Sequence, residues 1–124
     1  MRTPALFLAV AAAAMAAPAM AHPKLLASNP AADATVPATS SVQLTFSERL
    51  VGEFSHLQVA MTDMPGMRMS SPMTIQGKTA LGADGTTLTI SFAKPLPVGT
   101  YKVSYQVVST DTHKIQGGYG FKVH

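Results

Sequence analysis

The residues of this chain with the clearest chemical potential form a short polar stretch, Ser109-Thr110-Asp111-Thr112-His113. It follows an alternating apolar segment, Tyr101 to Val108, that predicts a β-strand. If the backbone stays extended, Asp111 and His113 project from one face about 6.5 Å apart along the chain. A carboxylate and an imidazole so placed can bind one metal ion. In the alternative interpretation, Asp111 begins a turn and His113 is an ordinary surface histidine.

The N-terminal segment has the pattern of a secretory signal peptide. Arg2 supplies a positive charge, Leu6 to Ala17 is continuously apolar, and small residues occupy the cleavage-determining positions of Ala19-Met20-Ala21. The apolar run is shorter than the roughly 20 residues that span a bilayer, and no later segment is apolar enough. We therefore predict a signal peptide over residues 1–21 and one exported, non-membrane-spanning domain over residues 22–124.

Cleavage after Ala21 makes His22 the first residue, which gives it two potential metal ligands. The reference pKa of an α-amine is about 7.7–8.0, so a metal can displace its proton near neutral pH. The amine and the imidazole of His22 can then chelate one ion, whereas Pro23 has no amide proton to release. The alternative is that His22 is a frayed chain end without a role.

Composition excludes several other classes of site and partner. The chain has no cysteine, so disulfides and thiolate metal sites are absent. Without Arg2, eight basic and six acidic residues remain, a net charge of only +2 with neutral histidines. The basic residues are scattered and there is no tryptophan, so we expect no nucleic-acid partner.

A methionine-rich segment is the second potential metal site. It contains five of the eight methionines, namely Met61, Met64, Met67, Met69 and Met73. Pro65-Gly66 and Pro72 oppose a helix, so we predict a loop. Thioether sulfur is a soft ligand that selects Cu(I), and His56 could add an imidazole, although strand alternation points it to solvent. The alternatives are methionines that fill gaps beneath the loop or form an adaptable partner-binding surface.

Period-two alternation of apolar residues predicts an all-β domain. It occurs at Val42–Phe46, Leu57–Met61, Leu88–Phe92, Tyr101–Val107 and Tyr119–Val123, and a short first strand is expected at residues 24–28. Gly- and Pro-containing turns separate these segments. We therefore predict a small Greek-key β-barrel or sandwich of about seven strands.

Two further residues stand out against this strand pattern. Tyr101 follows Pro97-Val98-Gly99-Thr100 and resembles the tyrosine that fixes a corner in immunoglobulin-like sandwiches, a purely structural role. Glu48 ends a strand and is either a carboxylate near the metal ligands or a surface group.

With these motifs assembled, the sequence resembles the CopC family of bacterial periplasmic copper-binding proteins. The resemblance rests on His22-Pro23-Lys24-Leu25, Leu44-Thr45-Phe46-Ser47-Glu48, Met64-Pro65-Gly66-Met67, Gly99-Thr100-Tyr101-Lys102-Val103 and Ser109-Thr110-Asp111-Thr112-His113. It implies a cupredoxin-like or immunoglobulin-like β-barrel that binds Cu(II) through His22, Asp111 and His113, with Glu48 nearby.

The same resemblance implies a Cu(I) site in the methionine loop at the far end of the barrel, at Met61, Met64, Met67 and Met73. Met69 stands where relatives carry a histidine, so the ligand set departs from theirs. A CopD-type inner-membrane copper transporter, or another periplasmic copper protein, is the implied partner.

We accordingly expect a monomeric, non-enzymatic periplasmic copper carrier or buffer that serves copper resistance, homeostasis or delivery. One rival hypothesis is a copper oxidase or monooxygenase, because two histidines that include the N-terminal one can build a histidine brace. The other is a metal-free sandwich module that binds a protein through the methionine loop.

Overall fold

The computed structural model describes residues 22–67 and 69–124. These residues form nine strands and one short 3-10 helix, η1, at Gly52–Phe54. The strands are β1 (Leu25–Asn29), β2 (Thr35–Val36), β3 (Ser41–Phe46), β4 (His56–Asp63), β5 (Met73–Ile75), β6 (Lys78–Leu81), β7 (Thr87–Ser91), β8 (Gly99–Val108) and β9 (Lys114–Val123). The predicted signal peptide, residues 1–21, lies outside the described residues.

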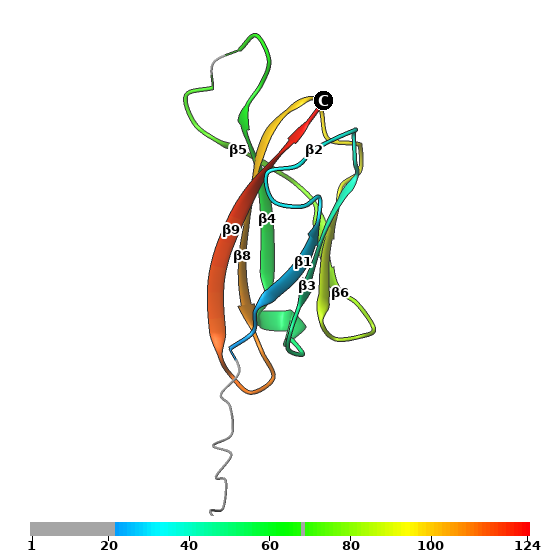
Figure 1. The fold of residues 1–124 in the computed structure, drawn as a ribbon, viewed down its shortest axis with the longest axis vertical. Helices are drawn as coiled ribbons and strands as arrows, with labels where there is room; N and C mark the ends of the chain where they lie inside the picture. The colour runs from blue at the N-terminus through cyan, green and yellow to red at the C-terminus, as the bar shows by residue number, and fades with distance from the viewer. Residues whose placement is uncertain (1–21, 68) are drawn as a thin grey trace, which may run out of the picture.

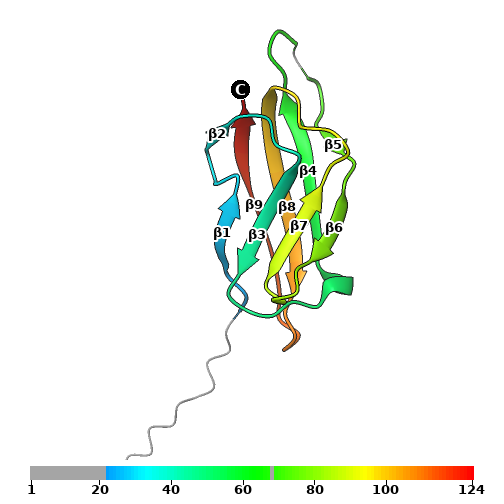
Figure 2. The same ribbon diagram turned by 90° about the vertical axis from the view of Figure 1, so that its right-hand side faces the viewer.

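The strands form two sheets that face each other (Figures 1 and 2). One sheet has the order β1-β3-β7-β6 and the other the order β2-β9-β8-β4-β5. The predicted all-β sandwich is therefore confirmed. Its strand number was underestimated because β2, β5 and β6 are only two to four residues long and lack the alternation that marked the other strands.

The core lies between the two sheets and follows the predicted alternation. Val42 and Leu44 on β3 are fully buried, as are Val59 on β4 and Val103 on β8, while their sequence neighbours face outward. Burial of each such side chain stabilises the fold by about 1.5–3 kcal/mol relative to exposure. The sandwich therefore provides a rigid scaffold for the loops at its two ends.

The longest pairing in the molecule is the antiparallel β8–β9 hairpin. Its register runs without interruption from Gly99 opposite Val123 to Val108 opposite Lys114. The other edge of β8 pairs with β4, so β8 lies inside its sheet. The turn that closes the hairpin, residues 109–113, is consequently held at one end of the sandwich.

A tyrosine corner fixes the opposite end of β8, as predicted. The Tyr101 hydroxyl donates a hydrogen bond of 2.5 Å to the carbonyl oxygen of Pro97, four residues upstream. The Tyr101 ring is buried and stacks on Phe121 of β9, with ring centres 5.4 Å apart. Burial also raises the pKa of the Tyr101 hydroxyl. These contacts connect the Pro-rich segment to the core.

No helix in the described part of the chain is long and apolar enough to cross a membrane.

Candidate metal centre

The stretch Ser109–His113 is a tight turn rather than the extended segment that an alternating pattern suggested. The Thr112 amide donates to the Ser109 carbonyl oxygen at 2.9 Å, and the Ser109 amide donates to the His113 carbonyl oxygen at 2.9 Å. Thr112 has a φ of 74°, a left-handed conformation that is rare for a β-branched residue. The hairpin must reverse here, and this reversal overrides the extended conformation.

The turn still brings the two predicted ligands together. Nδ1 of His113 lies 3.1 Å from Oδ1 of Asp111. The two atoms are close enough for a hydrogen bond but poorly directed, and Nδ1 is shielded from solvent without a hydrogen-bond partner among the described residues. A shielded nitrogen without a partner is costly, and a cation bound beside it would remove that cost. This pair therefore fits a metal ion.

The Asp111 carboxyl is held in its charged form. Its pKa is lowered, first by the hydrogen bond from the Ser109 hydroxyl and then by the contact with His113. The Asp111 side chain is about half exposed, whereas that of His113 is 21% exposed. A negatively charged carboxylate beside an imidazole is a suitable ligand pair for a divalent cation.

His22 reaches the same turn from the other end of the chain. The Lys24 amide donates to the Ser47 hydroxyl at 2.8 Å, and the Ser47 amide donates to the Lys24 carbonyl oxygen at 2.9 Å. This anchor lies next to β1, and it places the His22 ring edge-to-face with that of His113, their centres 4.8 Å apart. Because an imidazole nitrogen lies about 2.0–2.1 Å from a bound metal, two rings on one ion have centres roughly 4.5–6.5 Å apart.

Glu48 does not end a strand, because β3 stops at Phe46, but the segment that carries it borders this cluster. Thr110 donates its amide to the Arg49 carbonyl oxygen at 2.9 Å, and Leu50 forms an isolated β-bridge with Ser109. The Glu48 backbone thus lies between segments that contact both halves of the site. Within the described residues, however, no group of three or more His, Asp or Glu side chains is arranged to hold a metal.

Cleavage after Ala21 would add a further potential ligand at His22. In the full-length chain the nitrogen of His22 belongs to the peptide bond with Ala21, so it is not an amine. Only cleavage would convert it into a ligand with a displaceable proton. The structure thus places His22 against His113 and His113 against Asp111.

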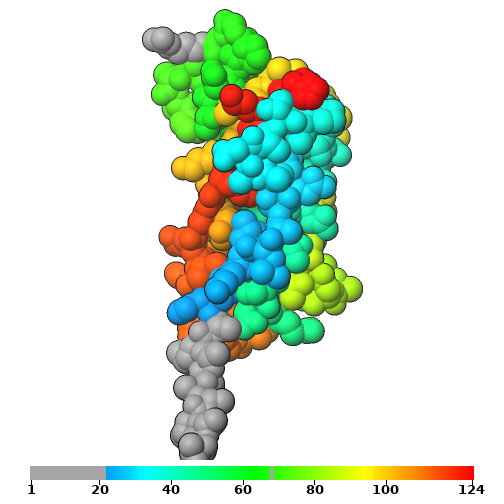
Figure 3. Space-filling model, viewed as in Figure 1, coloured from blue at the N-terminus to red at the C-terminus, as the bar shows by residue number. Residues whose placement is uncertain are grey.

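The methionine segment projects from the opposite end of the sandwich (Figures 1 and 3). Residues 64–67 and 69–72 belong to the predicted loop, whereas Met61 lies on β4 and Met73 on β5, directly opposite each other in the register. In the loop, the Met67 amide donates to the Met64 carbonyl oxygen at 3.1 Å across a turn in which Gly66 has a φ of 76°. Gly favours this left-handed conformation because it has no Cβ.

The five methionines differ widely in exposure. Met61 is fully buried in the core, Met64 and Met69 are partly buried against it, and Met67 and Met73 are 59% and 48% exposed. The buried Met61 packs as an ordinary core side chain. The exposed Met67 and Met73 carry the sulfur atoms that a metal can reach without a rearrangement of the core.

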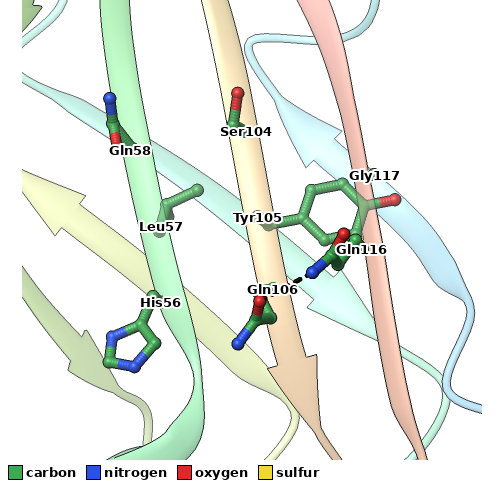
Figure 4. Close-up of a pocket in the computed structure, with 8 residues that line it drawn as sticks. All are labelled: His56, Leu57, Gln58, Ser104, Tyr105, Gln106, Gln116 and Gly117. Carbon is green, nitrogen blue, oxygen red and sulfur yellow. Dashed lines mark hydrogen bonds between the residues drawn. The ribbon is translucent and has the colours of Figure 1, made fainter.

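His56 lies at the start of β4, opposite Gln106 of β8 and therefore near the end that carries the hairpin turn. It faces solvent on the outer side of β4, as its position in the strand predicted, and borders a shallow hollow of about 330 Å³ (Figure 4). Gln106 on β8 and Gln116 on β9 line the same hollow and share a hydrogen bond of 2.7 Å. The residues that line it include no carboxylate and no second imidazole.

Two serines at the metal centre were not predicted as functional residues. Ser47 anchors the segment that carries His22, and Ser109 donates its hydroxyl to Oδ1 of Asp111. Ser109 is also almost completely buried. The only sequence signal for Ser109 was its place two residues before Asp111, which is the spacing of a side-chain contact within a turn.

The chain is a β-sandwich protein whose two ends differ in chemistry. Imidazole and carboxylate groups lie at one end, and methionine thioethers lie at the other. The CopC domain family model matches residues 25–124. The chain belongs to the CopC family, which confirms the resemblance found in the sequence.

Named relatives agree with this assignment. The chain is 49% identical to copper resistance protein C of Escherichia coli over 105 residues, covering 85% of this chain and 83% of the relative. It is 45% identical to copper resistance protein C of Xanthomonas campestris pv. juglandis over 114 residues, covering 92% and 89%. The crystal structure of PcoC, a copper resistance protein from Escherichia coli, superposes with a TM-score of 0.77 at 46% identity, covering 82% of this chain and 99% of that one.

Proposed function

We propose that this protein is a periplasmic copper carrier or buffer that acts in copper resistance, homeostasis or delivery. Copper is the metal supported by membership of a family whose relatives are copper resistance proteins. Removal of the predicted signal peptide after Ala21 releases the mature protein and also creates the amine at His22. Export and metal binding are thereby coupled through one cleavage.

Cu(II) binds at His22, Asp111 and His113. The observation that carries this proposal is the edge-to-face contact of the two imidazole rings, 4.8 Å between centres, together with the shielded Nδ1 atom of His113, which has no hydrogen-bond partner in the described chain. The α-amine adds the further nitrogen. Among divalent ions, Cu(II) binds most strongly to such nitrogen-rich sites. Glu48 is a candidate for an additional oxygen contact.

Cu(I) binds in the methionine segment at the other end of the sandwich. Met67 and Met73 offer accessible sulfurs, and Met64 and Met69 are half-buried beside them. Met61 joins the ligand set only if its side chain leaves the core. Ligands of opposite softness at opposite ends let one monomer hold either oxidation state and pass copper to a CopD-type transporter or another periplasmic protein.

The carrier proposal assigns no catalytic turnover to the copper. The Asp111 carboxylate beside His113 can occupy a coordination position that an oxidase keeps open for its substrate. Peroxide production with a reductant should therefore not exceed that of free copper. A higher, protein-dependent rate would favour an enzyme with a histidine brace.

The decisive experiment compares protein that begins at His22 with the same protein carrying one extra N-terminal glycine. Both are titrated with Cu(II) against a competing chelator and examined by electron paramagnetic resonance. We expect a tight, nitrogen-rich signal in the first protein and a weakened, altered signal in the second. Identical affinities and spectra would show that the amine of His22 is not a ligand.

A further inference from the structure

We propose that Ser109 is the positioning residue of the Cu(II) site, because its buried hydroxyl fixes one carboxylate oxygen of Asp111 and leaves the other to face the metal. This inference rests on the proposed Cu(II) site. Ser109 itself is not a ligand in this proposal. It acts through the orientation of Asp111.

The burial of Ser109 is the first argument. Among the residues described, only Ser55 and Ser109 are buried polar side chains, and Ser109 is 1% exposed. A buried hydroxyl without a hydrogen bond is costly. The single hydroxyl proton of Ser109 has two acceptors in reach, Oδ1 of Asp111 and, at the longer distance of 3.3 Å, the His113 carbonyl oxygen. The closer and charged acceptor is Asp111.

The second argument is that Ser109 controls the backbone of both proposed ligands in the turn. Its amide donates to the carbonyl oxygen of His113, and its carbonyl oxygen accepts from the amide of Thr112. These bonds hold Thr112 in its left-handed conformation. The side chain and the backbone of Ser109 therefore together set the spacing between Asp111 and His113.

The distribution of contacts over the Asp111 carboxylate gives the third argument. Oδ1 accepts from the Ser109 hydroxyl and, at 3.4 Å, from the His113 amide, and it also lies 3.1 Å from Nδ1 of His113. Oδ2 accepts no hydrogen bond within the part of the chain that the structure describes. With Oδ1 engaged by the protein, Asp111 can offer a metal one oxygen, Oδ2. Hydrogen bonds that orient a ligand in this way typically change metal affinity by about 10–100-fold.

A purely structural role for Ser109 makes a different prediction, and Ser55 supplies the matched control. Ser55 is also buried, its hydroxyl donates to the Val51 carbonyl oxygen at 2.8 Å, and it accepts from the Val108 amide at 3.2 Å. It thus supports the same end of β8 with a comparable number of hydrogen bonds. No hydrogen bond joins Ser55 to Asp111 or His113 in the described structure.

The test uses mature protein that begins at His22 and compares wild type, Ser109→Ala, Ser55→Ala and His113→Ala. Thermal unfolding, Cu(II) affinity by chelator competition and the Cu(II) resonance spectrum are measured for each. We expect Ser109→Ala to bind Cu(II) about 10–100-fold more weakly with an altered spectrum. Ser55→Ala should be destabilised to a similar extent but bind within about threefold of wild type.

Wild-type affinity in Ser109→Ala, or an equal loss in Ser55→Ala, would overturn the positioning role. If His113→Ala binds Cu(II) as tightly as wild type does, His113 is not a ligand and the proposed Cu(II) site is wrong. That result would be a separate failure from loss of the positioning role. A crystal structure of the copper-loaded wild type gives a test without mutation. Copper on Oδ2 with Oδ1 on the Ser109 hydroxyl supports the proposal, and copper on Oδ1 contradicts it.

Discussion

The rings of His22 and His113 contact each other edge-to-face, with centres 4.8 Å apart, although they lie at opposite ends of the folded domain's sequence. β1 pairs with β3, and the strand end after β3 contacts the β8–β9 turn, so the two histidines are brought together through the sandwich. The proposed Cu(II) site therefore depends on the fold, because its ligands come together only in the folded chain.

Replacement of His113 by alanine should weaken Cu(II) binding by at least about 100-fold, because loss of a ligand costs no less than loss of a residue that orients one. The measurement is chelator competition on protein that begins at His22. His56→Ala is the matched control, since His56 is exposed on the outer face of β4. An equal loss in both variants would indicate non-specific histidine binding.

Substitutions of methionine should separate packing from metal binding. Met61→Ala should destabilise the fold by about 2–5 kcal/mol because it opens a cavity in the core, whereas Met61→Leu should cost less than about 1.5 kcal/mol. Met67→Leu should leave stability almost unchanged and weaken Cu(I) binding, because Met67 is 59% exposed.

These effects can be measured by denaturant unfolding and by Cu(I) competition with a chromophoric chelator. If Met61→Leu weakens Cu(I) binding as much as Met67→Leu does, the Met61 side chain leaves the core to bind copper. If Met67→Leu binds Cu(I) like wild type, the accessible sulfurs are not the ligands.

The turn between β6 and β7 should make stability depend on acid pH. Hydrogen bonds from the Thr87 hydroxyl and from the amides of Thr86 and Thr87 lower the pKa of Asp84 from 3.8 to about 2. Since the native pKa is the lower one, this contribution is complete above about pH 5 and is lost progressively as the pH falls through 2.

Asp84→Asn is nearly isosteric and removes the charge; its amide oxygen can still accept from the amides of Thr86 and Thr87, but its NH2 group cannot accept from the Thr87 hydroxyl. Its thermal midpoint should lie below that of wild type at pH 7, and the two midpoints should converge near pH 2. A difference that persists unchanged down to pH 2 would mean that the Asp84 charge is not responsible.

The tyrosine corner should contribute to stability and not to copper binding. Tyr101→Phe removes the hydrogen bond to the Pro97 carbonyl oxygen while the buried ring remains, so the free energy of unfolding should fall by about 0.5–1.5 kcal/mol. Urea unfolding measures the loss. Cu(II) affinity should remain that of wild type, since the hairpin turn lies at the other end of β8; a weaker affinity would reveal coupling between the two ends.

Local sequence determined the strands that carry the core. Val42, Leu44, Leu57 and Val59 alternate with polar residues, and a strand with one buried face requires this period. Pro65-Gly66 likewise marked the loop, because a helix cannot accommodate it. The short edge strand β5 was missed, since three residues with little burial show no period.

Residue types also identified the donors, because imidazole, carboxylate and thioether ligands have metal preferences that do not depend on the fold. Tertiary structure decided how these donors are arranged. It turned Ser109–His113 back on itself, buried Met61 while leaving Met67 exposed, and placed the His22 ring against that of His113. The physical reason is that such contacts join residues distant in sequence, and only the packing of two sheets determines which of them meet.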